Sequence, residues 1–596
     1  MNPEDRVPAS GAGRRSGSAG GAALRVAAPA RGGTAGLAAL LGALAVWGGW
    51  FIFRTSFVID GRRVFCLFDD AMISMTYARN LVEGYGLNWA RQGAPVEGFT
   101  HPLWTALMVP VNALPIGLER RSLVVQVGSL ALLLVNVVLI RRLMLRHFTR
   151  PAAHHWWPAC VATAFYYPLV FWSLVGMETG LQAVLTTALV LLALDVVHGR
   201  RDRHLALLLA GTVAVLLRPD MALLVVAALF YVLANGGLRA AGPAVRRGWL
   251  LGLAALAAAV SGYTLFRWVY FHDLLPNTYY LKLQGIPLVV RLLRGGDAML
   301  DTLRMHWPLL LAVAIGVVPQ LPWLRPRDGE SDSHWGNKLA LPAAVFVLCC
   351  AYSVYVGGDA WEEEVSANRF VVFAMPLLFV LFNALANQAL AAARRRRRRT
   401  AREPGAPGGG APDGDGFPGG PRDPLALRCA LLAATAAALL AANGLWQPES
   451  AEESWRKLAA VSRPTEADKY REIIGLVRLA QKLAAPSAVV AVTWAGTPAY
   501  FSDFRMVDTL GYNDRHIARE KPARELTEDN FEDYVPGHAK WDYAYLLRER
   551  RPDIFLQTWG GEEVTSALRA HGYRRIGDLW IDPASPRVHL GSTGAK

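Results

Sequence analysis

Long apolar runs fill most of the chain up to about residue 446, and short polar segments separate them. A helix needs roughly 17 to 25 mainly apolar residues to cross a bilayer. The run at 102–117 is shorter and interrupted by prolines, so we expect a re-entrant or interfacial piece there. The remaining runs predict about eleven spanning helices, near residues 34–53, 122–140, 157–175, 179–197, 204–217, 221–235, 248–270, 306–324, 338–356, 370–390 and 425–446.

The pattern changes after residue 446. Helical periodicity covers 470–483 and 562–571, strands are expected at 488–493 and 553–556, and a short element is expected at 504–509. We therefore expect a small α/β domain that packs over the mouth of the membrane part. This segment is rich in aromatic residues, which either fill its core or offer an apolar face to sugar rings: Trp494, Tyr500, Trp541, Tyr543 and Trp559.

Composition agrees with this pattern. Of 596 residues, 53% are hydrophobic and only 18% are charged, against roughly 25% charged in soluble domains. The expected fold class is a polytopic α-helical membrane protein with a C-terminal α/β domain. The net charge of +14 does not indicate nucleic-acid binding, because the excess arginines lie in short runs beside apolar segments. Such runs are typical of cytoplasmic loops under the positive-inside rule.

This charge distribution orients the chain. With the N-terminal tail in the cytoplasm, the basic loops share the cytoplasmic side: 141–150, 198–204, 239–247, 325–338 and 394–422. The expected division is a disordered tail (1–33), a membrane domain (34–393) with its first external loop (54–121), a flexible basic linker rich in Gly and Pro (394–424), a last spanning helix (425–446) and an external α/β domain (447–596).

Five loops on the external side carry acids together with isolated cations. Polar groups at membrane depth are expensive and usually mark a site. Taken singly, some have a structural explanation: Glu178 as a helix cap, Asp220 as part of a turn, and Lys282 as a side chain reaching the headgroups. As a set they suit a phosphate leaving group and a hydroxyl nucleophile: Asp69, Asp70, Glu97, Glu178, Arg218, Asp220, Asn277, Tyr279, Lys282, Asp359 and Arg369.

The adjacent carboxylates of Asp69 and Asp70 are the candidate reaction centre. They precede an apolar helical run, so either can cap that helix, and one can cap while the other reacts. An external acid beside cations fits sugar transfer from a polyprenyl-phosphate donor, because nucleotide sugars are absent outside the cytoplasm. The carboxylate would act as general base on the acceptor hydroxyl, and Arg or Lys would stabilise the departing phosphate.

Three stretches of the first loop also carry a resemblance: FDDAMISMTYARN at 68–80, GYGL at 84–87 and VEGFTHPLW at 96–104. They resemble the first loop of the superfamily C glycosyltransferases (GT-C) and, more closely, of the actinobacterial terminal β-(1→2)-arabinofuranosyltransferases. Supporting similarities lie at 176–179, 275–280, 357–359, 507–511 and 536–538. The resemblance implies a GT-C fold and an inverting, plasma-membrane transferase of cell-wall biogenesis that uses decaprenyl-phosphoryl-arabinofuranose, with Asp69 or Asp70 as base.

The roles expected for the other residues are less specific. We place donor-phosphate binding on Arg218, Lys282 and Arg369, and substrate binding or shaping of the site on Glu97, Glu178, Asp220, Asn277, Tyr279 and Asp359. No ligand spacing demands a cofactor, but the acids leave a site for Mg²⁺ or Ca²⁺ open. The expected partners are the lipid bilayer, the polyprenyl-phosphate sugar and a cell-envelope glycan acceptor, and not nucleic acid.

Two alternatives stay open at this stage. The same reaction can use another polyprenyl-phosphate sugar, such as mannose. A transporter of lipid-linked sugars also has many helices and intramembrane polar groups, but it would be expected to contain inverted repeats. No two halves of this sequence look alike.

Overall fold

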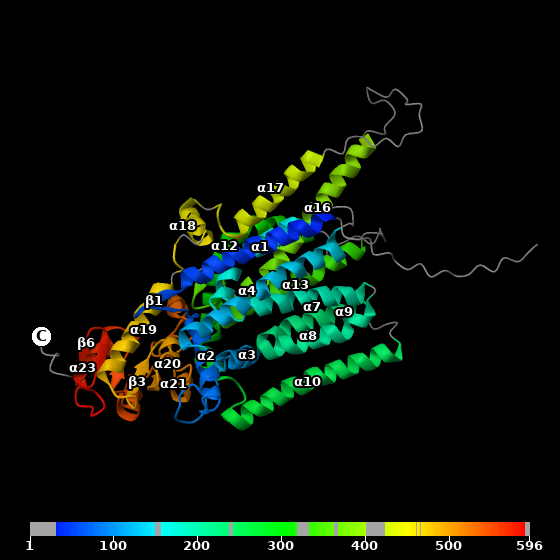
Figure 1. Cartoon of the computed structure of the whole chain (residues 1–596). Coiled ribbons are helices and arrows are strands. Elements are labelled where there is room, and N and C mark those ends of the chain that lie inside the picture. The colour runs from blue at the N-terminus through cyan, green and yellow to red at the C-terminus, as the bar shows by residue number, and fades with distance from the viewer. Residues whose placement is uncertain are drawn as a thin grey trace, which may run out of the picture.

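Long helices lie side by side in the computed structural model of the chain, and a small α/β domain gathers at one end of them (Figure 1). The structure describes residues 31–149, 156–198, 200–237, 242–318, 333–362, 368–400, 424–446, 448–459, 462–464 and 466–590. Most of the expected tail (1–33) and of the expected linker (394–424) lies outside these residues.

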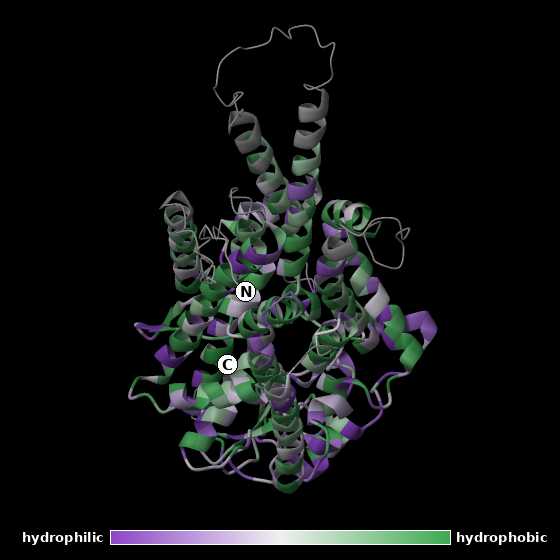
Figure 2. Cartoon of the chain, turned by 90° about the vertical axis from the view of Figure 1, so that its right-hand side faces the viewer, coloured by the Kyte–Doolittle hydropathy of each residue, from purple (hydrophilic) through white to green (hydrophobic). Residues whose placement is uncertain are grey.

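Seven helices in the described part of the chain are long and apolar enough to cross a membrane, and three shorter apolar helices accompany them. Hydrophobic residues run along these helices in Figure 2. The polytopic helical class predicted from the sequence is therefore confirmed. The main helices are α1 (Arg31–Thr55), α4 (Leu118–Leu143), α5 (Trp157–Ala164), α6 (Tyr167–Leu174), α7 (Thr179–Val197), α8 (His204–Leu217), α9 (Ala222–Ala234), α10 (Pro243–Phe271), α12 (Leu288–Val317), α13 (Ser333–Val356), α16 (Met375–Thr400) and α17 (Pro424–Ala442).

Two predicted helices have other bounds. The run at 157–175 is divided into α5 and α6, because Pro168 lacks the N–H that would continue the hydrogen bonds of α5. Helix α12 begins at Leu288, well before the run expected from residue 306. Its first turns carry charged residues that hide the helix from an apolar-run count, yet one face of these turns is buried.

The connection between α1 and α4 forms a folded layer at the end of the bundle that faces the α/β domain (Figure 1). It contains the hairpin of β1 (Phe57–Ile59) and β2 (Arg62–Val64), then α2 (Asp69–Val82) and α3 (Pro102–Asn112). Helix α3 has 11 residues and is too short to span, as expected for the run at 102–117. Helix α2 is buried along most of its length, between α3 and the α/β domain.

The α/β domain is built on a five-stranded sheet of order β4-β3-β5-β7-β6. Strand β3 pairs in parallel with β4 and β5, and β7 is antiparallel to both β5 and β6. The strands are β3 (Val489–Val492), β4 (Arg505–Asp508), β5 (Ile554–Phe555), β6 (Arg574–Ile576) and β7 (Leu579–Ile581), and the helices include α19 (Glu466–Leu483), α20 (Thr497–Tyr500), α21 (Arg515–Arg519), α22 (Tyr543–Tyr545) and α23 (Glu562–Ala570). Both helices and both strands predicted from the sequence are confirmed, and the short element expected at 504–509 is strand β4. The β6–β7 hairpin was not predicted.

The α/β domain docks on α2 through buried polar contacts. The Arg79 guanidinium donates to the carbonyl oxygens of Tyr500 (2.6 Å) and Ser502 (3.2 Å) and to the Asp503 carboxylate (2.7 Å). The Trp89 indole N–H donates to the carbonyl oxygen of Ala495 at 2.7 Å. Because these donors are buried, their hydrogen bonds hold the α/β domain against the first loop in one orientation.

We expect Arg79→Met to loosen this docking. The substitution leaves two carbonyl oxygens without their donor and should lower the free energy of unfolding by about 3 kcal/mol. Thermal unfolding and trypsin sensitivity of the detergent-solubilised chain measure the effect. Arg575→Met is the matched control, because Arg575 pairs with Asp578 on the exposed surface. Equal melting temperatures for the two variants would contradict this docking role.

Candidate functional site

The candidate site lies at the start of α2, where three distant segments meet. The Asp70 carboxylate accepts a hydrogen bond from Nη1 of Arg369 at 2.9 Å. The same guanidinium binds both oxygens of Asp359, through Nε at 2.6 Å and Nη2 at 2.7 Å. Three residues expected from the sequence therefore form one ion-paired group. Asp70 keeps 22% of its side chain exposed, whereas Asp359 keeps 3%.

Asp69 faces the α/β domain instead. Its two carboxylate oxygens accept hydrogen bonds from the backbone N–H groups of Gly496 (2.9 Å) and Thr497 (2.7 Å). Burial raises the pKa of Asp69 to about 6, although these backbone donors oppose the rise. A Cβ at position 496 would lie 2.0 Å from the Asp69 carbonyl oxygen, so only glycine allows this approach. Asp69 thus holds the domain at the N-terminus of α20.

Arg369 is placed by its surroundings. Asn368 caps the short helix α15 (Arg369–Val372) by accepting the backbone N–H of Phe370. The guanidinium lies over the ring of Trp172, 4.9 Å from its centre, a favourable cation–π distance. Burial alone would raise the pKa of Asp359, but the charge and hydrogen bonds of Arg369 lower it overall. The pair is therefore ionised at neutral pH.

The loop that carries Asp359 is held by Glu362. One Glu362 oxygen accepts the backbone N–H of Asp359 at 2.8 Å and the side-chain amide of Asn368 at 2.7 Å, and the other pairs with Arg294 at 2.9 Å. Gly357 and Gly358 precede Asp359 with φ of 92° and 79°, which glycine adopts without strain. The turn and the carboxylate together fix the Asp359 position.

Lys282 provides a second cation. It ends α11 (Asn277–Lys282), and its ammonium lies 5.6 Å from the centre of the Tyr512 ring. Among the described residues, this ammonium has no carboxylate within ion-pair distance and no hydrogen bond. Burial lowers its pKa, while the charges of Asp70 and Asp359 act in the opposite direction. Lys282 is therefore a cation near Asp70 that is free to bind an anion.

Aromatic residues from the α/β domain close this region. The His538 ring lies 5.6 Å from Trp361 and 6.2 Å from Tyr512, and Trp361 in turn meets Phe68 at 5.2 Å. Burial lowers the pKa of His538 to about 4, so its imidazole is neutral at pH 7. None of these four side chains was assigned to the site from the sequence. The motifs at 507–511 and 536–538 were the available signal for Tyr512 and His538.

Arg218 belongs to a second ionic group. It donates to both oxygens of Asp220, with the shortest contact at 2.7 Å, and to Glu178 at 2.6 Å. Burial opposes ionisation of Glu178, but His101 and Arg218 lower its pKa to about 2. The group adjoins the first one, because Arg218 lies 5.6 Å from the ring of Phe370, next to Arg369. The positive charge of Arg218 is therefore already balanced by the carboxylates of Asp220 and Glu178.

The remaining predicted residues lie in other contacts. Glu97 accepts from Arg267 and, at 2.6 Å, from the Tyr263 hydroxyl, and so binds the first loop to α10. The Asn277 amide donates to the carbonyl oxygens of Gly511 (2.8 Å) and Tyr512 (3.0 Å) and so docks the α/β domain. Tyr279 is 42% exposed and meets Tyr280 edge-on. These residues shape the surroundings of the Asp70 group without joining it.

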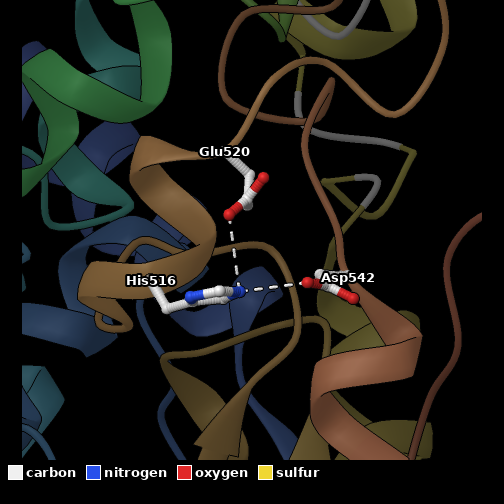
Figure 3. A group of neighbouring side chains, drawn as sticks. All are labelled: His516, Glu520 and Asp542. Atoms are coloured by element: carbon white, nitrogen blue, oxygen red, sulfur yellow. Dashed lines mark hydrogen bonds and ion pairs between the residues drawn. The ribbon is translucent and has the colours of Figure 1, made fainter.

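The carboxylates considered for a metal are each bound by other groups. Asp359 and Asp220 pair with arginines, and Asp69 accepts two backbone N–H groups. Within the described ranges, one group of His and acidic ligand atoms lies close enough together to hold an ion, and it is made of His516, Glu520 and Asp542 (Figure 3). It contains none of the acids expected from the sequence. His516 Nε2 lies 3.0 Å from Asp542 and stacks on Tyr545, so the group already forms an ion pair.

Known proteins resemble the chain in fold. The structure of ArnT from Cupriavidus metallidurans bound to undecaprenyl phosphate aligns with a TM-score of 0.51 and 12% identity, over 93% of this chain and 99% of that one. The chain therefore shares the fold of this ArnT structure. The apo state of the same ArnT aligns with a TM-score of 0.46 and 13% identity, over 92% and 98%. The similarity to the structure with undecaprenyl phosphate confirms the predicted architecture of a helical membrane domain followed by an α/β domain.

Sequence comparison is informative only for the C-terminal part. A family model described as "Domain of unknown function (DUF8728)" matches residues 460–591. These residues contain the whole five-stranded sheet and also Tyr512 and His538. No curated protein matches the chain.

Arg369→Gln should destabilise the protein in a pH-dependent way. The lowered pKa of Asp359 stabilises the native fold fully above its unfolded pKa of about 3.9, and this contribution is lost as the pH falls. Without Arg369, a buried carboxylate has no counter-charge, so we expect a loss of about 3 to 5 kcal/mol at pH 7. The loss of stability in the variant should shrink towards pH 4, where Asp359 of the variant becomes protonated. Melting temperatures across this range measure it.

The double variant Arg369→Gln/Asp359→Asn distinguishes charge from packing. It should regain most of the lost stability at pH 7, because no carboxylate is then left at the buried position 359 without a counter-charge. The Asp70 carboxylate also loses Arg369, but it is partly exposed. Arg304→Gln, at an exposed pair with Asp301, serves as the control. A deficit that is constant with pH and persists in the double variant would contradict the ion-pair explanation.

Proposed function

We propose that the chain is an inverting glycosyltransferase that moves a sugar from a polyprenyl-phosphate donor to a cell-envelope glycan on the external face of the membrane. The observation that carries the proposal is the partly exposed Asp70 carboxylate, fixed by Arg369. The Lys282 cation lies nearby and has no ion-pair partner within the described part of the chain. The GT-C fold supports it, as does a structural neighbour that was crystallised with undecaprenyl phosphate. The first-loop resemblance favours arabinofuranose as the sugar.

Asp70 is the better candidate for the general base. Both oxygens of Asp69 are occupied by backbone N–H groups, and its side chain is buried, so an acceptor hydroxyl has no access to it. Asp70 has one oxygen bound by Arg369 and a partly exposed carboxylate. A general base must lie within hydrogen-bond reach of the proton that it removes. Asp69 then serves as a positioning residue that sets the start of α2.

The reaction needs a single displacement. Asp70 takes the proton of the acceptor hydroxyl, and the hydroxyl oxygen forms a bond to the anomeric carbon of the donor. The bond from that carbon to the phosphate oxygen breaks, and its electron pair leaves with the polyprenyl phosphate. One displacement inverts the anomeric centre. Lys282 is the cation with free capacity for the phosphate, because Arg369 and Arg218 are already bound by acids.

Asp70→Asn should abolish transfer while the protein stays folded. Loss of a general base typically costs 10² to 10⁴ in rate, so we expect kcat to fall at least about 10³-fold. The assay follows radiolabel from decaprenyl-phosphoryl-arabinose, and in parallel from decaprenyl-phosphoryl-mannose, to a short arabinan acceptor. Asp60→Asn is the matched control, since Asp60 lies in the exposed β1–β2 turn at φ 49°, which asparagine tolerates. Full turnover by Asp70→Asn would refute the proposed base.

Lys282→Met tests the phosphate site. Removal of the free ammonium should lower kcat/KM for the polyprenyl-phosphate donor about 10² to 10³-fold, in the range for loss of one stabilising donor. It should leave acceptor KM within a factor of about two. Lys482→Met, at an exposed lysine in the last turn of α19, is the control. Unchanged donor kinetics would exclude Lys282 from the phosphate site, and donor movement across vesicles without transfer would favour a transporter.

A further inference from the structure

A cleft of about 380 Å³ opens on the α/β domain beside the proposed reaction site. Its volume falls within the range of roughly 300 to 1,000 Å³ that is usual for small-molecule sites. The residues that line it include two tryptophans, one histidine and a polar rim: Trp541, Trp559, His538, Arg524, Asp533 and Thr558. The family described as a domain of unknown function covers all of them.

His538 joins this cleft to the Asp70 group. Its ring lies 5.2 Å from the ring of Trp559 on the cleft side and 5.6 Å from Trp361 on the other. Trp361 contacts Phe68, which immediately precedes Asp69 and Asp70. The charge of Asp70 also acts on His538. His538 therefore lies between the cleft and the Asp70 group.

The cleft is rigid. The Trp559 backbone N–H donates to the Tyr543 hydroxyl at 2.9 Å, and its indole N–H donates to the carbonyl oxygen of His538 at 3.2 Å. Gly560 and Gly561 follow with φ of 113° and 77°. A Cβ at Gly560 would lie 2.7 Å from Val564 and 3.2 Å from the Trp541 indole nitrogen, so a side chain there would displace the wall. Two hydrogen bonds and close packing at Gly560 thus position the aromatic surface of the cleft.

The chemistry of the lining indicates a carbohydrate. Trp559 is 37% exposed and offers a ring face, on which the C–H face of a sugar packs well. Arg524 and Asp533 are exposed at the rim, and neither has an ion-pair partner among the described residues. An apolar platform with free donors and acceptors around it matches a ligand that has both C–H faces and many hydroxyl groups.

We propose that this cleft binds the acceptor oligosaccharide, with Trp559 as the stacking platform. The proposal rests on the proposed glycosyltransferase function and assigns the acceptor-binding role to the C-terminal domain. Trp559 acts on binding of the acceptor and not on the chemical step. Its removal therefore changes acceptor affinity and acceptor KM, while kcat and donor binding stay close to their native values.

The experiment uses the full chain in detergent with two probes, an arabinan tetrasaccharide and a mannan tetrasaccharide. Saturation-transfer NMR and calorimetry measure binding, and a separate titration with undecaprenyl phosphate reports the donor side. We expect at least one oligosaccharide to bind, and Trp559→Ala to weaken it tenfold or more. Trp559→Phe, which keeps a ring, should retain most of the affinity. Trp455→Ala, at an exposed tryptophan of α18 (Pro448–Leu458), is the matched control and should bind as the native chain does.

A second variant, at the rim of the cleft, distinguishes loss of binding from loss of folding. Asp533→Ala changes an exposed side chain and should weaken binding about threefold or more with an unchanged melting temperature. Failure of both oligosaccharides to bind the native chain would overturn the proposal, as would equal binding by Trp559→Ala and the native chain. In the transfer assay, Trp559→Ala should raise acceptor KM about tenfold and leave kcat within about threefold.

These results separate the two proposals. Oligosaccharide binding that depends on Trp559, in a chain that transfers no sugar from either polyprenyl-phosphate donor, would support the cleft and refute the transferase. Transfer with an acceptor KM that Trp559→Ala leaves unchanged would support the transferase and refute the cleft.

Discussion

The candidate site depends on one buried guanidinium. Arg369 gives two hydrogen bonds to Asp359 and a third to Asp70. A buried guanidinium and one carboxylate form a neutral pair. The hydrogen bonds of that pair fix the direction of the remaining N–H groups of the guanidinium. Asp70 therefore accepts a hydrogen bond from an Arg369 N–H group whose direction is fixed. The carboxylate is held in one orientation while part of it remains open to a substrate.

Two neighbouring carboxylates have different tasks because they stand at the start of a helix. Successive residues of a helix point about 100° apart, so Asp69 and Asp70 face different partners. Asp69 binds the backbone at the N-terminus of α20, and Asp70 faces Arg369. The same turn of α2 thus positions the α/β domain and presents the reactive group. Displacement of the domain would disturb both at once.

Local sequence was sufficient for much of this arrangement. Apolar runs identified most helices, alternation and periodicity located β3, β4, β5, α19 and α23, and the acidic pair pointed to the start of α2. Which acid is buried could not be predicted, because Gly496 and Thr497 bury Asp69 from more than 400 residues away along the chain. The β6–β7 hairpin has strands of only three residues, too short for an alternation signal.

The same limit explains which site residues were missed. His538 and Tyr512 are ordinary aromatic residues in their local sequence, and only the folded α/β domain places them beside Trp361 and Lys282. Arg218 was predicted as a donor-phosphate ligand because an isolated arginine on an external loop has the right charge. In the structure, the carboxylates of Asp220, two residues on, and Glu178, forty residues earlier, pair with Arg218 and balance its charge.

The charges of the proposed site suit a reaction that moves charge without creating it. Asp70 and Asp359 balance Arg369 and Lys282 before the substrates bind. When Asp70 accepts a proton it loses its negative charge, and the departing phosphate gains one. The negative charge thus passes from the Arg369 side of the site to the Lys282 side. A partly buried site stabilises such a transfer more easily than it stabilises a new charge, because each cation is already in place where the charge begins or ends.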